Sequence, residues 1–120
     1  MQILLVEDEA IIAMDIEMIL ESAGYGLIIT TNTVAAALRK IGEQGFDAAL
    51  LDLNLGSETT IAVADELVRR EIPFLLVTGR DAPSLPEQLR SRPIVRKPYG
   101  PGEILRTLGT ALQGAGMELN

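Results

Sequence analysis

Five short apolar runs, spread along the chain, constrain the fold more than any other feature of this sequence. Each is rich in Ile, Leu or Val, and they are Ile3 to Val6, Leu27 to Ile29, Ala48 to Leu51, Phe74 to Val77 and Ile94 to Val95. The runs are continuous, without the polar alternation of a half-exposed strand. This pattern is typical of strands that a parallel sheet buries on both faces beneath helices.

The segments between the runs carry apolar residues at helical spacing, so each presents one apolar stripe. The stripes are Ile12, Ile16, Ile19 and Ala23 in the first segment, Val34, Ala37, Leu38 and Ile41 in the second, and Ile61, Ala64, Leu67 and Val68 in the third. We expect Gly24, Gly45 and Pro73 to end these helices, and Thr59 or Thr60 to cap the third. A last helix is expected from about Pro101 to Leu112, whereas residues 79–93, with three prolines, predict only one short helix.

Strands that alternate with helices predict a doubly wound α/β fold with a five-stranded parallel sheet. The length of 120 residues favours a single domain, with a core of about residues 2–113 and a tail at 114–120. Two strand orders are common in such sheets. The dinucleotide-binding order 3-2-1-4-5 needs a glycine-rich turn after the first strand, and the sequence VEDEA has no glycine there. The flavodoxin-like order 2-1-3-4-5 is therefore expected.

Composition narrows the chemistry that this chain can perform. It has no cysteine and no histidine, which excludes disulfides, thiolate or imidazole metal sites and Ser-His-Asp catalysis. The net charge is −7, and residues 1–38 carry six acids and no Lys or Arg, so we expect no nucleic-acid partner. The N-terminus does not resemble a signal peptide and no apolar run could span a membrane, so we expect a cytoplasmic protein without a membrane partner.

Polar residues stand where four of the five strands end. In this fold, functional side chains lie beyond the carboxyl ends of the strands, near the point where the strand order reverses. Strand one ends at Glu7 and Asp8, strand three at Asp52, strand four at Thr78 and strand five at Lys97. The order 2-1-3-4-5 brings Glu7, Asp8 and Asp52 together.

A cluster of carboxylates needs a cation to offset their repulsion. Oxygen ligands favour Mg²⁺, and Mn²⁺ would also fit. The alternative is that these acids only favour the positive end of the first helix, which is our interpretation for Glu9. Beside a metal and a lysine, Asp52 is placed as a nucleophile that could take a phosphoryl group. Lys97 would pair with the phosphoryl oxygens and Thr78 would donate a hydrogen bond to them.

The motifs LLVEDE, LLDLNLG, VTG and RKPY resemble the receiver domain of bacterial two-component response regulators over residues 2–113. The resemblance implies that Glu7, Asp8 and Asp52 bind the metal and that Asn54 adds its backbone carbonyl. It also implies that Asp52 is the phosphoacceptor, that Thr78 is the switch hydroxyl and that Lys97 pairs with the phosphate. A cis peptide between Lys97 and Pro98 is implied as well.

Two further features concern the subfamily. Ile94 stands where the family usually has an aromatic residue that changes rotamer, three residues before the lysine. The stretch IPFLLVTG resembles the fourth-strand signature of the stand-alone "FAT GUY" receivers, which lack the same aromatic. Gly79 matches that signature and Arg80 departs from it.

The resemblance implies a signalling phosphoacceptor, one that assists its own phosphorylation and dephosphorylation and is not a conventional enzyme. The donor would be a sensor histidine kinase or a histidine phosphotransfer protein, and an unknown protein would read the signal. A haloacid-dehalogenase-like phosphatase is an alternative, but it needs a second acid two residues after the nucleophile, where this chain has Asn54. A phosphate-independent pseudo-receiver is another alternative, although its usual loss of a site acid or lysine is absent.

Overall fold

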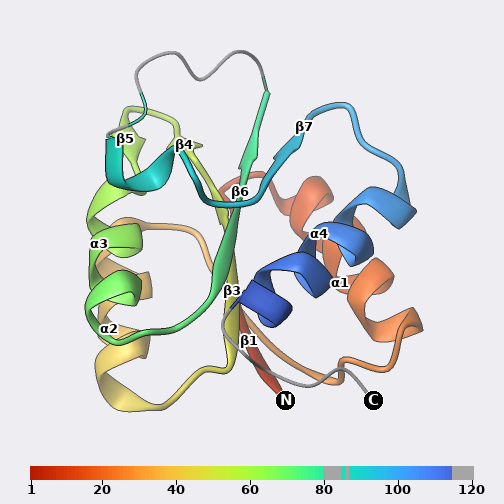
Figure 1. The fold of residues 1–120 in the computed structure, drawn as a ribbon, viewed down its shortest axis with the longest axis horizontal. Coiled ribbons are helices and arrows are strands. Elements are labelled where there is room, and N and C mark those ends of the chain that lie inside the picture. Colours follow the sequence, from red (N-terminus) through yellow and green to blue (C-terminus); the bar gives the residue numbers. More distant parts are fainter. Residues whose placement is uncertain (80–84, 86, 115–120) are drawn as a thin grey trace.

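The computed structural model describes residues 1–79, 85 and 87–114, and it confirms the predicted parallel sheet. The strands lie in the order β2 (Leu27–Thr31), β1 (Gln2–Val6), β3 (Ala48–Asp52), β6 (Phe74–Thr78) and β7 (Ile94–Arg96). Each neighbouring pair is parallel. Since β6 and β7 are the fourth and fifth strands of this sheet along the chain, the order is the predicted 2-1-3-4-5 (Figure 1).

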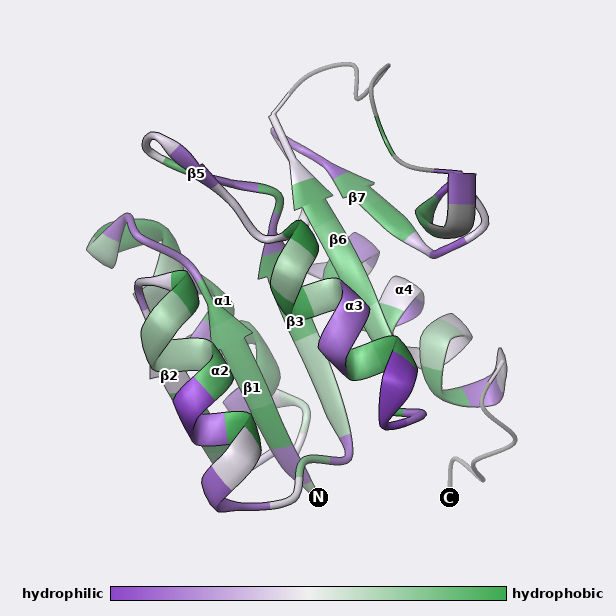
Figure 2. Ribbon diagram, turned by 90° about the vertical axis from the view of Figure 1, so that its left-hand side faces the viewer, coloured by the Kyte–Doolittle hydropathy of each residue, from purple (hydrophilic) through white to green (hydrophobic). Residues whose placement is uncertain are grey.

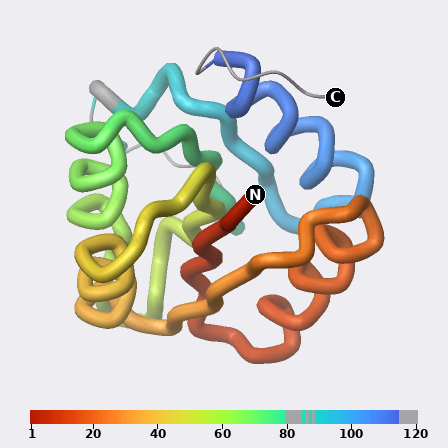
Figure 3. Tube along the Cα trace, turned by 90° about the horizontal axis from the view of Figure 1, so that it is seen from below, coloured from red at the N-terminus to blue at the C-terminus, as the bar shows by residue number. Residues whose placement is uncertain are grey.

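Helices cover both faces of the sheet. One face packs against α1 (Ala10–Ser22) and α4 (Pro101–Gly114), and the other against α2 (Val34–Glu43) and α3 (Ile61–Arg69). Figure 3, seen from below, shows the two helix layers on opposite sides of the strands. This arrangement explains why the strands are apolar on both faces.

Two hydrophobic cores follow from the alternation of side chains along the strands. In β1, Leu4 and Val6 belong to the core beneath α2 and α3, whereas Ile3 and Leu5 belong to the core beneath α1 and α4. The strands β3 and β6 are buried throughout, and β6 is green along most of its length in Figure 2. Burial of this kind holds the carboxyl ends of the central strands at one edge of a rigid sheet.

The predicted helix boundaries agree with the structure to within a few residues. Gly24 follows α1 with a φ of 96°, a conformation that favours glycine, and Pro73 lies between α3 and β6. Thr33 caps α2, because its hydroxyl oxygen accepts a hydrogen bond from Ala36 N at 3.0 Å. Thr60 occupies the predicted N-cap position of α3, but its side chain makes no capping hydrogen bond. That part of the prediction is wrong.

The segment that joins β3 to α3 contains two short strands of its own. It forms a small antiparallel hairpin of β4 (Asn54–Leu55) and β5 (Glu58–Thr59), visible in Figure 1. Within 79–93, a single turn of 3-10 helix, η1 (Glu87–Leu89), is present, while residues 80–84 and 86 lie outside the described residues. The expected tail also lies outside them beyond Gly114. Of the helices that the structure describes, none has the length and apolar character to cross a membrane.

Candidate functional site

The carboxyl ends of β1 and β3 bring two acidic side chains next to each other. The strand register pairs Val6 with Leu51, so the following residues, Glu7 and Asp52, lie side by side at the edge of the sheet. Both are buried, with 2% and 6% of their surface exposed. Asp8 is exposed on the rim. The position is the one that the strand order predicted.

The three acids form a cluster with the geometry of a cation site. One carboxylate oxygen from each of Glu7, Asp8 and Asp52 lies within 4.8 Å of the other two. Glu7 Oε1 is buried and accepts no hydrogen bond from any residue that the structure describes. A buried carboxylate oxygen without a donor is costly, and a hard divalent cation would satisfy it. The residues present therefore fit Mg²⁺ or Mn²⁺.

Lys97 joins this cluster from the end of β7. Its Nζ lies 3.2 Å from Asp52 Oδ2 and 3.7 Å from Glu7 Oε1. The backbone holds the lysine in place, because Lys97 N donates to Thr78 O at 2.8 Å. The peptide between Lys97 and Pro98 is cis, as expected. One ammonium group thus faces two buried carboxylates, which leaves the site with excess negative charge.

Burial changes the proton affinity of these groups. Burial and, after it, the neighbouring Asp52 carboxyl together raise the pKa of Glu7 to about 7, against the opposing effects of the Glu9 N–H and Lys97. Burial by itself would lower the pKa of Lys97, but the charges of Asp52 and Glu7 outweigh it, so the pKa is raised. Lys97 therefore remains charged at neutral pH, while Glu7 is close to its titration point.

Thr78 and Asn54 complete the set of residues expected at the site. Thr78 ends β6, is buried, and stands one residue beyond Val77, which pairs with Asp52 in the sheet. Asn54 begins the hairpin, and its backbone N–H donates to Asp52 Oδ1 at 3.3 Å. Each predicted site residue therefore lies at the same edge of the sheet. The metal-binding role expected for the Asn54 carbonyl stays a prediction.

Two residues at this edge were not among the predicted site residues. Thr60 is completely buried and donates its hydroxyl to Asp52 O at 2.9 Å, a contact that a helix-capping pattern does not reveal. Tyr99 follows the cis proline, and burial raises its pKa to about 12, aided by Asp15, Glu7 and Asp52. Its position directly after RKP was the only sequence signal for it.

The sequence also matches a family model. The model described as "Response regulator receiver domain" matches residues 3–108. This chain belongs to the response regulator receiver domain family. It is thus a receiver domain of two-component signalling, and the site described above occupies the edge of the sheet where its acidic residues meet.

Curated relatives agree with this family. The receiver is 31% identical over 116 residues to the phyllosphere-induced regulator PhyR of Methylorubrum extorquens, and the match covers 92% of this chain and 43% of PhyR. It is 30% identical over 118 residues to the sensory transduction protein RegX3 of Mycobacterium tuberculosis, covering 95% of this chain and 52% of RegX3. The chain therefore spans about half the length of these relatives.

Solved structures support the same assignment. The solution structure of SdrG from Sphingomonas melonis Fr1 is 41% identical, with a TM-score of 0.81, and the match covers 92% of this chain and 95% of SdrG. A second SdrG structure, described as a BeF3-activated conformation, has a TM-score of 0.79 at the same identity and coverage. The fold of the receiver is therefore shared with a protein of similar size.

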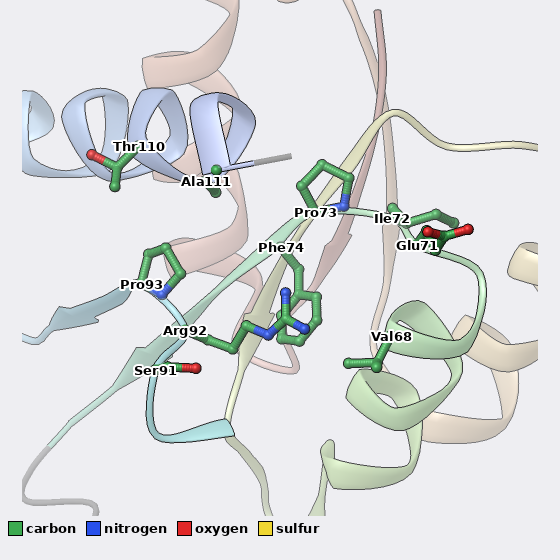
Figure 4. A pocket seen from close by; sticks show the side chains of 11 residues that line it. Val68, Glu71, Ile72, Pro73, Phe74, Ser91, Arg92, Pro93, Thr110 and Ala111 are labelled. Carbon is green, nitrogen blue, oxygen red and sulfur yellow. The ribbon is translucent and has the colours of Figure 1, made fainter. Parts of the chain in front are cut away.

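A separate cavity lies at the opposite end of the strands. It is lined by residues from the ends of α3 and α4 and from the segments that precede β6 and β7 (Figure 4). The Arg92 guanidinium lies over the Phe74 ring, 5.0 Å from its centroid. Because Phe74 and Pro93 mark the amino ends of their strands, this cavity is remote from the carboxylates at the carboxyl ends.

Proposed function

We propose that Asp52 is the phosphoacceptor of this receiver domain and that it takes a phosphoryl group from a phosphohistidine in a step that requires Mg²⁺. The observation that carries this proposal is the position of the Asp52 carboxylate. It is buried at the edge of the sheet, 3.2 Å from Lys97 Nζ and within 4.8 Å of two other carboxylates. This combination of nucleophile, cation site and fixed positive charge is what phosphoryl transfer requires.

The chemistry would proceed by in-line displacement at phosphorus. An Asp52 carboxylate oxygen forms the new P–O bond as the P–N bond of the donor breaks, and the electron pair of that bond returns to the donor imidazole. Glu7, Asp8, Asp52 and the Asn54 carbonyl would hold Mg²⁺, which supplies neutralisation of phosphoryl charge when bound. Lys97 would pair with one phosphoryl oxygen, and the Thr78 hydroxyl would donate to another.

The donor would be a sensor histidine kinase or a histidine phosphotransfer protein. The helix that borders the site, α1, exposes Ile11, Met14 and Met18 at helical spacing, with 83%, 60% and 66% of their surface accessible. Exposed apolar side chains gathered on one helix favour contact with another protein. In this proposal residues 1–120 act as one domain, in the cytoplasm, and signal through a further protein partner.

The phosphatase alternative receives less support from the site. That chemistry needs a second acid two residues after the nucleophile to serve the leaving group. Asn54 stands at this position, and its backbone N–H donates to Asp52 Oδ1. An amide side chain cannot act as the general acid, so turnover of phosphate esters is not favoured.

The proposal is tested by intact-mass measurement after incubation with acetyl phosphate, with and without Mg²⁺. The wild-type protein should gain one phosphoryl group only with Mg²⁺. Asp52→Asn should gain none and remain folded. Asp65→Asn, on the exposed side of α3, is the matched control and should be labelled as well as wild type. Full labelling of Asp52→Asn would overturn the assignment.

A further inference from the structure

Thr60 connects the start of α3 to the strand that carries Asp52. It is completely buried, and its Oγ1 donates to Asp52 O at 2.9 Å, with a second, longer contact to Leu53 O at 3.4 Å. Its backbone N–H donates to Leu53 O at 3.0 Å. One residue therefore holds two successive carbonyls at the point where β3 ends.

The hydroxyl of Thr60 makes these contacts in place of an ordinary helix cap. At an N-cap, a threonine oxygen normally accepts a hydrogen bond from a backbone N–H two or three residues later. Thr33 does so at the start of α2, whereas Thr60 makes no such bond at the start of α3. The hydroxyl is thus directed to the peptide that follows Asp52.

These hydrogen bonds close the base of the β4–β5 hairpin. The hairpin begins after Asp52, at the end of β3, and ends just before Thr60, which precedes α3, so the Thr60 contacts hold its two ends together. On the other side of the strand, Leu53 N donates to Val77 O at 2.9 Å. The Leu53 peptide is therefore held from both sides, which restricts the orientation of the Asp52 carboxylate before it and of the Asn54 carbonyl after it.

We propose that Thr60 is a positioning residue of the site, whose hydroxyl fixes the Asp52–Asn54 backbone in the orientation needed for metal binding and phosphoryl transfer. This inference rests on the proposed function. Residues that orient metal ligands through hydrogen bonds commonly change metal affinity by about 10-fold to 100-fold when they are replaced. Thr60 holds the main-chain carbonyl of Asp52, a proposed metal ligand. It also holds the carbonyl of Leu53, the residue before Asn54, whose carbonyl is another proposed ligand.

The test compares two substitutions that separate the hydroxyl from the methyl group. Thr60→Val keeps the shape of the side chain and removes the hydroxyl, whereas Thr60→Ser keeps the hydroxyl and removes the methyl group. Val63→Ala is the matched control, because Val63 is also completely buried in the first turn of α3 but has no polar group. Mg²⁺ affinity is measured by isothermal titration calorimetry, the rate of labelling by acetyl phosphate at saturating Mg²⁺ by intact mass, and stability by urea denaturation.

We expect Thr60→Val to bind Mg²⁺ roughly 10-fold more weakly and to be labelled more slowly. Thr60→Ser should bind within about twofold of wild type, since its hydroxyl can still donate to Asp52 O. Val63→Ala should lose stability but keep its Mg²⁺ affinity. Equal Mg²⁺ affinity of Thr60→Val and wild type would overturn the inference. A loss of Mg²⁺ affinity in Thr60→Ser or Val63→Ala as large as that in Thr60→Val would also overturn it.

The outcomes separate this inference from the proposed function. If wild type is labelled on Asp52 and Thr60→Val matches it in both Mg²⁺ affinity and rate, only the role of Thr60 fails. If wild type neither binds Mg²⁺ nor is labelled on Asp52, the proposed function fails and the positioning role fails with it.

Discussion

At the scale of single residues, the buried carboxylate of Glu7 lowers the stability of the metal-free folded protein. It is an acid with 2% of its surface exposed, beside the Asp52 carboxylate, and its Oε1 has no hydrogen-bond donor among the described residues. Lys97 Nζ, 3.7 Å away, offsets only part of this unfavourable environment. The pKa of Glu7 is therefore raised to about 7, because burial and Asp52 favour the neutral carboxyl more than Lys97 favours the charged one.

The raised pKa predicts how the stability of the metal-free protein depends on pH. Between pH 4.5 and 7 the folded state binds the Glu7 proton more tightly than the unfolded state does, so the free energy of unfolding falls as the pH rises through this window. The favourable contribution is complete below pH 4.5 and lost above pH 7. Glu7→Gln, which stays neutral, should therefore stabilise the metal-free protein at pH 8 by on the order of 2 kcal/mol, measured by urea denaturation.

The matched control is Glu21→Gln, an exposed position near the end of α1. It should change the free energy of unfolding little at any pH, since an exposed side chain is not desolvated. The stability difference between Glu7→Gln and wild type should be larger at pH 8 than at pH 4.5. An equal difference at the two pH values would mean that Glu7 is better solvated than the structure indicates.

At the scale of elements, the β4–β5 hairpin is the feature that distinguishes the connection after Asp52. Its turn contains Gly56, which has a φ of 60°. A Cβ built at Gly56 would lie 3.8 Å from Asp8 Oδ2, which is an ordinary contact. The requirement for glycine here is therefore set by the backbone conformation and not by lack of space. The turn at Gly56, after β3, thus lies close to Asp8, which follows β1.

Two glycine substitutions should change stability in opposite directions. Gly56→Ala should destabilise the metal-free protein by about 1 kcal/mol, because alanine disfavours the left-handed backbone conformation. Gly42→Ala, inside α2 with open space where the new Cβ would lie, should stabilise it by about 0.5 kcal/mol, since alanine restricts the unfolded chain and favours the helix. Urea denaturation measures both. A stabilised Gly56→Ala would contradict the turn conformation described above.

At the scale of the whole molecule, negative charge is concentrated in one part of the fold. The net charge is −7, and the first basic residue is Arg39. The proposed metal ligands lie within this acidic region or face it across the sheet. Sodium ions in solution would weaken the general repulsion by screening, whereas a bound divalent cation would act only at the cluster.

Comparison of two salts should separate these effects. MgCl₂ should raise the melting temperature more than NaCl at equal ionic strength, and at a free Mg²⁺ concentration of 100 times Kd the gain is about 2.7 kcal/mol. Asp8→Asn should lose most of the Mg²⁺-specific increase and keep the response to NaCl. Equal responses of wild type to the two salts would contradict a metal site at Glu7, Asp8 and Asp52.

Local pattern in the sequence determined most of the architecture. The apolar runs could be assigned to strands because residues buried on both faces of a sheet must be apolar along their whole length, as β3 and β6 are. Glu7, Asp52, Thr78 and Lys97 could be placed at one edge because parallel strands bring their carboxyl ends together. The strand assignments and the position of these residues could be predicted because both depend on the local periodicity of the sequence and on the strand order inferred from it.

Only the tertiary structure decided how the polar groups at that edge are used. The Thr60 hydroxyl had a helix cap and the Asp52 carbonyl as competing partners, and the hairpin geometry selected the carbonyl. The pKa of Glu7 likewise depends on burial, on Asp52 and on Lys97. These three residues lie at the carboxyl ends of β1, β3 and β7, which are far apart in the sequence. Desolvation and hydrogen-bond direction arise between segments distant along the chain, so they became fixed only when the packed sheet placed those segments in contact.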